Sequence, residues 1–367
     1  MTQDIIKNRK YSVGVIGATG YVGQHFVSLL SDHPWFEIKH LYASERSRGM
    51  TYQQAIAGRE KTNQVFKPEI AELQLMSLAE LETAASDLDF VFCAVSMAKE
   101  EVCALEEKIA RLELPVVSNN SAHRGTPDVP MIIPELNWQH AEIINAQKKR
   151  LGTSRGFIAV KPNCSIQSYV PAIHPLLSYE PNRINVVTAQ AVSGAGRSLA
   201  DWPEMDANVI PYIGGEEEKS EQEPLKIWGS IAGEVIRPAI NPIISAQCLR
   251  VPVEHGHLAA VSVAFKQRIS KEEILSAWEN FKIPDQVREL PSAVEKFLNY
   301  WHETDRPQSK LDAGAERGMQ INIGRLREDN IFDYKFICLS HNIMRGAAGG
   351  AVLMAEQLCH QGWIEQR

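Results

Sequence analysis

The sequence predicts an α/β protein in two parts: an N-terminal, Rossmann-like part with a parallel sheet, and an α+β part with a mostly antiparallel sheet. Apolar runs alternate with helical periodicity in the first 160 residues, a pattern typical of βαβ units. After residue 184, strand-like runs follow one another with hairpin-like or longer connections. A chain of 367 residues is long enough for two domains, each with its own core.

The first part opens with a buried strand, a glycine turn and an apolar helix. The runs that follow have the length and β-branched content of buried strands. Because a helical segment separates them, we expect the strands to lie in one parallel sheet. The predicted strands are 11–16, 37–43, 88–96 and 114–119, and the predicted helices end at Leu30 and span 99–112.

The second part is richer in strands, and its last segment returns to a helix after several glycines. We expect residues 1–160 and 343–367 to form the first domain, with the C-terminal helix returning to it, and residues 161–342 to form the second. A helix-like run covers 168–177. The later predicted strands are 184–193, 249–253, 258–265, 318–326 and 332–340, and the last helix lies within 346–361.

Gly17, Gly20 and Gly23 follow the first strand directly and open the first helix. Glycine permits a tight turn and a close approach of the backbone, and the helix N-terminus favours an anion such as a pyrophosphate. The turn therefore predicts a dinucleotide-binding site.

The end of the second strand indicates which dinucleotide binds. An NAD site usually offers an acidic residue to the ribose at this point. Here Ser44, Arg46 and Ser47 are suited to a 2′-phosphate, since arginine matches phosphate geometry, although Glu45 lies among them. The segment favours NADP.

Composition excludes several other classes of protein. A net charge of −7 argues against a nucleic-acid partner, and no apolar run reaches the roughly 18 residues of a membrane span. The segment MTQDIIKNRK lacks the apolar core of a signal peptide. The six cysteines are scattered without CxxC pairs, so we expect no metal site and a reducing, cytoplasmic setting.

Cys164, in KPNCSIQSY, allows two interpretations. Free cysteines are commonly small buried hydrophobes. A cysteine at a helix N-terminus is instead suited to nucleophilic chemistry, because the free N–H groups and the dipole favour the thiolate. Beside a nicotinamide cofactor, such a thiolate would attack an acyl carbon and form a thioester that a hydride reduces to an aldehyde.

That reaction also needs an acid/base, an anchor for the leaving group and donors to the oxyanion. The histidine His257 opens a predicted strand, and Arg124, Arg250 and Lys219 are cations near loop or element ends. Each has an ordinary structural alternative, as a buried histidine or a solvated charge. The acidic run 216–218 would likewise suit an exposed helix start.

Taken together, the motifs resemble aspartate-semialdehyde dehydrogenase, in particular the branch of that family common in archaea and fungi. The resemblance covers nearly the whole chain. The ordered blocks are VGVIGATGYVG, SNNSAHR, DVPMIIPELN, PNCS, QAVSGAG, NVIPYIGGEEEK, RVPVEHGH and HNIMRGAAGG.

The resemblance implies roles for residues of the second part. Cys164 would form the acyl-thioester, Gln190 would orient the substrate and His257 would be the acid/base. Arg250 would pair with the substrate α-carboxylate and Glu216 with its ammonium group. The phosphate would be shared by Lys219, Arg124 and Asn163.

It also implies NADPH-dependent reduction of L-aspartyl 4-phosphate to L-aspartate 4-semialdehyde, in the biosynthesis of lysine, threonine and methionine, by a homodimer or homotetramer. The residues expected to bind NADP are Gly17, Thr19, Gly20, Tyr21, Val22, Gly23, Ser44, Arg46, Ser47, Ser96, Ser193, Gly194 and Asn342.

Three positions depart from the family pattern. Ile166 replaces a usual threonine, Met50 replaces a common lysine near the ribose end, and Pro224 replaces a threonine after Glu223. None is a proposed catalytic group, but the first two touch the pocket and the cofactor.

Two other classes of function remain open at this stage. One is a related acyl reductase on the same scaffold, such as a malonyl-CoA reductase or an N-acetyl-glutamyl-phosphate reductase. Glu216 argues against malonyl-CoA, because it would repel the second carboxylate of the malonyl group. The other is a non-catalytic NADP-binding protein, which would be expected to lack Cys164 or His257.

Overall fold

The computed structural model describes residues 9–367. Residues 1–8, which fall within the predicted first domain and the MTQDIIKNRK segment, lie outside the described residues. The first sheet has the order β3-β2-β1-β4-β5-β6, and every pairing in it is parallel. Its strands are β1 Tyr11–Ile16, β2 Phe36–Tyr42, β3 Leu75–Met76, β4 Phe90–Cys93, β5 Val116–Ser118 and β6 Ile158–Val160.

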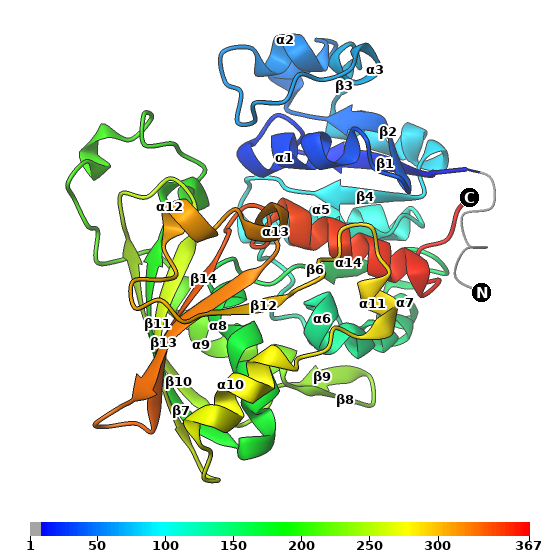
Figure 1. Ribbon diagram of the computed structural model, residues 1–367. Coiled ribbons are helices and arrows are strands. Elements are labelled where there is room, and N and C mark those ends of the chain that lie inside the picture. The colour runs from blue at the N-terminus through cyan, green and yellow to red at the C-terminus, as the bar shows by residue number, and fades with distance from the viewer. Residues whose placement is uncertain (1–8) are drawn as a thin grey trace.

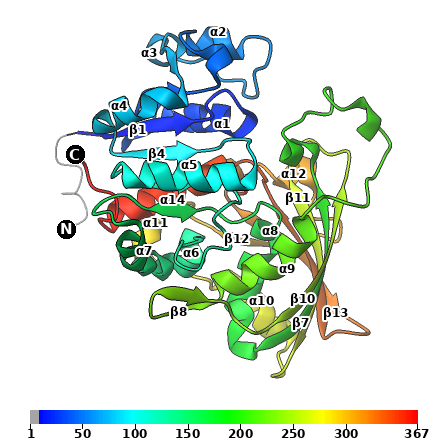
Figure 2. The same cartoon turned by 180° about the vertical axis from the view of Figure 1, so that it is seen from behind.

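Helices cover both faces of this sheet, which explains why β1, β4, β5 and β6 are buried along their whole length. On one face α1 (Tyr21–Leu30) packs beside α14 (Ala348–His360) (Figure 1), and on the other lie α5 (Lys99–Arg111) and α7 (Ile144–Leu151) (Figure 2). The shorter helices of this part are α2 Tyr52–Ile56, α3 Pro68–Ala71, α4 Leu81–Ala84 and α6 Pro134–Asn137.

The second sheet has the order β10-β7-β11-β14-β13-β12. Three of its pairings are antiparallel, whereas β10 with β7 and β12 with β13 are parallel. The sheet is therefore mixed, with antiparallel strands at its centre. Its strands are β7 Pro181–Gln190, β10 Ile243–Arg250, β11 His257–Phe265, β12 Leu298–Trp301, β13 Ile321–Glu328 and β14 Tyr334–Ser340.

Helices α8 (Ile166–Ile173), α9 (Glu216–Ile227) and α10 (Lys271–Glu279) lie on one face of this mixed sheet (Figures 1 and 2). Helix α8 is buried along its whole length, and its apolar side chains join one core with residues of both sheets. The start of α8 therefore lies where the two parts meet. The remaining elements are β8 Ser230–Ala232, β9 Val235–Arg237, α11 Asp285–Arg288, α12 Ser309–Asp312 and α13 Ala315–Gly318.

Most of the long predicted elements are present with small shifts at their ends. The helix expected over 168–177 instead begins at Ile166 and becomes a 3₁₀ segment at His174–Tyr179, because Pro171 and Pro175 each remove a backbone donor. The run 249–253 contributes only the end of β10. Within residues 9–367, no helix is both long and apolar enough to cross a membrane.

Candidate active site

Cys164 lies two residues before α8, on the turn that leaves β6. The turn is fixed by Asn163, whose Oδ1 accepts hydrogen bonds from the backbone N–H of Ser165 at 2.7 Å and from its hydroxyl at 2.6 Å. The predicted position of the cysteine at a helix N-terminus is correct. The thiol is partly exposed and faces a cavity of about 230 Å³.

His257 begins β11 and is completely buried. Its Nε2 lies 3.4 Å from the sulfur of Cys164, and its Nδ1 accepts a hydrogen bond from the backbone N–H of Ala191 at 3.1 Å. In the neutral ring one nitrogen accepts and the other carries the hydrogen. The bond from Ala191 therefore leaves the hydrogen on Nε2, directed at the sulfur. Burial, followed by the nearby charge of Arg250, holds the pKa of His257 well below its usual value, which favours this neutral form.

The pKa of the Cys164 thiol differs from the expectation for a cysteine at a helix N-terminus. Burial and, after it, the carboxylate of Glu216 raise this pKa to about 11, against the opposing effect of Lys161, Arg124 and Arg250. Desolvation of the thiolate and one nearby anion outweigh the helix dipole. In the free chain the raised pKa therefore opposes the thiolate that a helix N-terminus would favour.

Glu216 connects the residues expected to contact the substrate. It is the first residue of α9 and follows Gly215, whose φ of 71° turns the chain into the helix. Its carboxylate accepts hydrogen bonds from the side-chain amides of Asn163 at 3.0 Å and Gln190 at 3.3 Å, and it forms an ion pair with Lys219 at 2.9 Å. Three side chains from three separate sequence blocks thus meet at one carboxylate.

Glu223 is a site residue that the sequence-based assignment did not include. Its carboxylate forms an ion pair with Arg124 at 3.1 Å and accepts the backbone N–H of Asn163 at 2.6 Å. It thereby holds two of the three residues expected to bind phosphate. Its spacing of seven from Glu216, which places both on one face of α9, is the signal that would have identified it.

Lys161 was also missed, although it stands in the KPNCS block. It is buried, and its ammonium nitrogen donates to the carbonyl oxygen of Pro162 at 2.7 Å. Burial holds its pKa well below the usual value, and the adjacent Arg124 lowers it further.

Arg250 ends β10, is buried, and donates to the carbonyl oxygen of Ala191 at 2.7 Å. Gly194 lies directly over it. A Cβ added at Gly194 would fall 2.9 Å from Nη1 of Arg250 and 2.9 Å from Nε2 of His257. Glycine is therefore required here by the close approach of the loop to two proposed catalytic side chains.

The glycine turn after β1 fits a dinucleotide. Gly17 has a φ of 82°, and a Cβ there would lie 2.3 Å from the carbonyl oxygen of Ala94. A Cβ at Gly23 would lie 2.0 Å from the carbonyl oxygen of Gly17, so the start of α1 packs tightly on the turn. No side chain caps α1 at Gly20, and its first N–H groups are left for an anion.

Residues expected to contact the cofactor come together from both parts of the chain. Asn342 donates to the hydroxyl of Ser193 at 2.8 Å and accepts the backbone N–H of Gly256 at 2.9 Å, which fixes the loop over the pocket. Thr19 lies in the glycine turn, and Ser96 lies in the exposed loop between β4 and α5. The predicted cofactor residues that line the same cavity as Cys164 are Tyr21, Val22, Ser193, Gly194 and Asn342.

The predicted ribose-phosphate residues lie apart from that cavity, just beyond the end of β2. Ser44 and Arg46 are exposed, and Ser47 is buried. Arg48 is bound through two nitrogens by Glu80, at 3.0 and 3.1 Å. Among the described residues, the structure gives Arg46 no hydrogen bond or ion pair.

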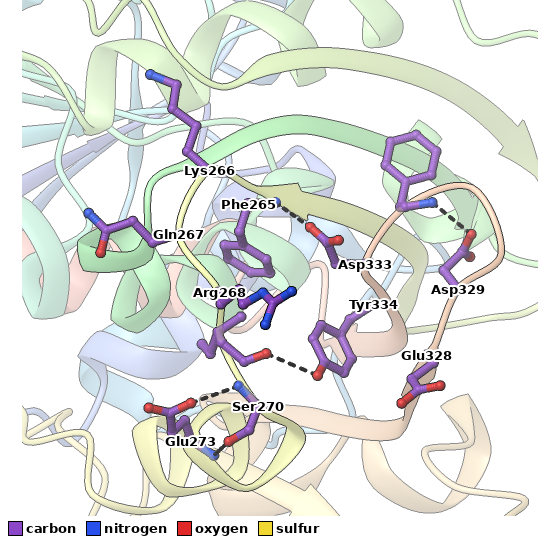
Figure 3. A pocket seen from close by; sticks show the side chains of 12 residues that line it. Phe265, Lys266, Gln267, Arg268, Ser270, Glu273, Glu328, Asp329, Asp333 and Tyr334 are labelled. Carbon is purple, nitrogen blue, oxygen red and sulfur yellow. Dashed lines mark hydrogen bonds between the residues drawn. The ribbon is translucent and has the colours of Figure 1, made fainter.

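A larger cavity, of about 590 Å³, lies elsewhere, between the end of β11 and the β13–β14 turn (Figure 3). Figure 3 shows Asp333 accepting the backbone N–H of Phe265 and Tyr334 donating to the segment before α10; these bonds measure 2.7 and 3.0 Å. No predicted site residue lines it, and these polar groups serve to hold the turn together.

Comparison with known proteins agrees with this architecture. A family model described as "Semialdehyde dehydrogenase, NAD binding domain" matches residues 12–144. A second, described as "Semialdehyde dehydrogenase, dimerisation domain", matches residues 173–345. These matches cover every strand of the two sheets except β6 and define the general class of the protein.

Individual relatives narrow the class. Aspartate-semialdehyde dehydrogenase from Archaeoglobus fulgidus is 41% identical over 95% of this chain and 97% of its own length, and that from Aspergillus fumigatus is 37% identical over 97% and 99%. The crystal structure of the Candida albicans enzyme with NADP matches with a TM-score of 0.87 and 32% identity, over 97% of this chain and 100% of that one. The chain belongs to the aspartate-semialdehyde dehydrogenase family.

Proposed function

We propose that this protein catalyses the reversible, NADPH-dependent reductive dephosphorylation of L-aspartyl 4-phosphate to L-aspartate 4-semialdehyde. The observation that carries the proposal is the contact of 3.4 Å between the Cys164 sulfur and His257 Nε2, in a cavity that cofactor-domain residues also line. The reaction serves the biosynthesis of lysine, threonine and methionine.

Cys164 acts as the nucleophile. Its sulfur attacks the acyl carbon, the bond from that carbon to the phosphate oxygen breaks, and a thioester forms; the leaving phosphate takes up the proton that the thiol loses. NADPH, when bound, supplies the hydride that reduces the thioester to the aldehyde. The hydrogen that His257 carries on Nε2 lies beside the sulfur, where it stabilises negative charge on the sulfur and on the adjacent acyl oxygen. The geometry thus supports the proton-donating half of the acid/base role.

The charges of the site match the groups of the substrate. Arg250 binds the α-carboxylate and Glu216 the ammonium group. Arg124, Lys219 and Asn163 bind the phosphate, with Arg124 and Asn163 held by Glu223. Gln190, which is bonded to Glu216, orients the substrate. In the free protein Lys219 and two amides occupy the Glu216 carboxylate, so the substrate ammonium replaces partners that are already present.

We also propose the division of the chain and its assembly. Residues 1–160 with 343–367 form the NADP-binding domain, and 161–342 the catalytic and dimerisation domain. The packing of α14 against α1 and β5 supports this division. The match to a dimerisation domain over 173–345 supports a homodimer or homotetramer, and we place the protein in the cytoplasm.

A phosphate-dependent assay tests the function. The purified protein should reduce NADP in the presence of aspartate semialdehyde and phosphate, and it should not consume NADPH with malonyl-CoA. Activity with malonyl-CoA alone would favour the related acyl reductase. Absence of both activities, in a preparation that binds NADP, would favour a non-catalytic binding protein.

A further inference from the structure

A second cavity of about 410 Å³ lies directly behind the phosphate-binding side chains. It is enclosed by the start of α5, the loop after β5 and one face of α9. Ser121, Arg124 and Lys219 line both this cavity and the one that holds Cys164. These three residues therefore form the wall between the two spaces.

The second cavity is positively charged overall. Four cations and two carboxylates line it. One carboxylate, Glu223, is already paired with Arg124, and Glu218 is the other. The ammonium group of Lys226 is enclosed by three backbone carbonyls at 2.8, 2.7 and 2.9 Å. Lys99, at the first position of α5, is exposed to solvent and is placed to attract an anion to the cavity.

The two cations of the wall are held very differently. Arg124 is fixed, since it donates to the carbonyl oxygen of Lys161 at 2.9 Å and is paired with Glu223 at 3.1 Å. Lys219 is half-buried, and within residues 9–367 its ammonium group has one partner, Glu216, at 2.9 Å. A lysine ammonium on a flexible stem can follow an anion over several ångströms, so Lys219 is able to move while Arg124 stays in place.

The Cys164 cavity is also lined by residues that we expect to contact the cofactor. These include Tyr21, Gly194 and Asn342, so a dinucleotide bound against them would cover part of that cavity. In the proposed reaction phosphate is formed at Arg124 and Lys219, which line both cavities. While the cofactor is in place, phosphate has a second route past Lys219 into the second cavity. The side chains expected to bind phosphate border this route.

We propose that the second cavity is a port through which inorganic phosphate leaves after thioester formation and enters in the reverse reaction. This inference rests on the proposed function. The port carries phosphate alone, while the amino-acid part of the substrate stays on the Cys164 side of the wall. It affects how fast phosphate reaches the site, and it leaves the affinity of the site itself unchanged.

Two variants test the port without touching the proposed catalytic residues. Gly125→Phe fills the cavity: Gly125 lines it, is not left-handed, and an added Cβ would meet no atom within 4 Å. Lys99→Glu reverses the charge at its mouth. Lys108→Glu is the matched control, on the same helix but outside the cavity.

The readout is kcat/KM for phosphate in the direction of aspartate semialdehyde oxidation. We expect it to fall about tenfold in both port variants, the lower end of the range by which electrostatic focusing and access change association rates. In Lys99→Glu its dependence on ionic strength should also weaken. The phosphate concentration that half-protects Cys164 from iodoacetamide should stay the same, and Lys108→Glu should behave as the unmodified protein.

Three results would overturn the port: an unchanged kcat/KM for phosphate in both variants, a parallel fall for aspartate semialdehyde, or weaker phosphate protection of Cys164. The second would mean that the whole substrate uses the cavity. Failure of the proposed function is distinguishable, because the unmodified protein would then be inactive. Thermal unfolding of Gly125→Phe shows whether it folds, and Lys99→Glu tests the port independently of that outcome.

Discussion

The substrate end of the active site and the ribose end beyond β2 differ in how far their side chains are bonded before any ligand arrives. At the substrate end, the Glu216 carboxylate has three side-chain partners within 3.3 Å. At the ribose end, Ser44 and Arg46 extend into solvent. This difference distinguishes the residues proposed to carry out the chemistry from the residues proposed to select the cofactor.

Chemistry requires charges that are already in place when the transition state forms, because reorienting them would add to the barrier. The network around Glu216 holds its charges in place in this way. It does so by burying charged groups, which must then stay paired. Selection between NADP and NAD needs one cation at the right distance. Arg46 is the cation that we propose for this selection, and it stands on an exposed turn, where sequence change does not disturb the core.

The largest effect is expected at the nucleophile. Cys164→Ser should abolish turnover while leaving NADP binding intact, because a serine hydroxyl is far less ionised than a thiol. The measurements are steady-state activity and a fluorescence titration with NADPH. Cys103→Ser, at the other partly exposed cysteine, should retain activity. Loss of activity in Cys103→Ser with retention in Cys164→Ser would refute the assignment.

The next effect concerns the ammonium contact. Glu216→Gln should cost about 2–5 kcal/mol in kcat/KM for aspartate semialdehyde, since it leaves the substrate ammonium without its opposite charge in the pocket. An analogue that lacks the amino group should lose less. Glu218→Gln is the control, because it makes the same change at an exposed position of the same helix. An equal loss on both substrates would show that Glu216 does not bind the ammonium group.

A smaller effect is expected at the ribose end. Arg46→Ala should raise KM for NADP far more than for NAD. The difference corresponds to a loss of about 1.5–3 kcal/mol of binding free energy for NADP, the usual contribution of a hydrogen bond to a charged group. Arg48→Ala should leave the preference for NADP unchanged, because Glu80 already binds that guanidinium. If instead Arg48→Ala changes the preference, Arg48 must leave Glu80 to bind the phosphate.

The smallest effect is on the pH dependence of the thiol. The thiolate is the reactive form, so a pKa of about 11 means that alkylation of Cys164 by iodoacetamide should still be accelerating at pH 10. Glu216→Gln removes an anion that raises this pKa, and alkylation at any lower pH should therefore become faster. A rate that levels off near pH 8 in the unmodified protein would contradict the raised pKa.

The sequence predicted β1, β4 and β5 well because these strands are buried on both faces and read as continuous apolar runs. It missed β3 and β6, whose two and three residues are too few to show a period. It also missed β12, since Leu298–Trp301 is a short edge strand whose pairing with β13 is parallel and so leaves no hairpin signal.

For the site, the motif blocks indicated Cys164 and His257, which the structure brings together. They did not indicate Glu223 or the pKa of the thiol. The importance of Glu223 depends on contacts with Arg124 and Asn163, which lie 99 and 60 positions away in the chain. The pKa depends on burial, which opposes the helix dipole and is set by the packing of both parts around α8.

The return of α14 to the first sheet also sets an order on how the protein is completed during synthesis. Ala348 to Cys359 are buried on every side of that helix, beside α1 and β5. They are translated after the whole second sheet, so until then the flank of α1 that α14 contacts has no cover. The nucleotide-binding part is thus interrupted by its neighbour, and a fragment that stops at residue 160 would lack one wall of its own core. Appending residues 343–367 to that fragment should restore the wall.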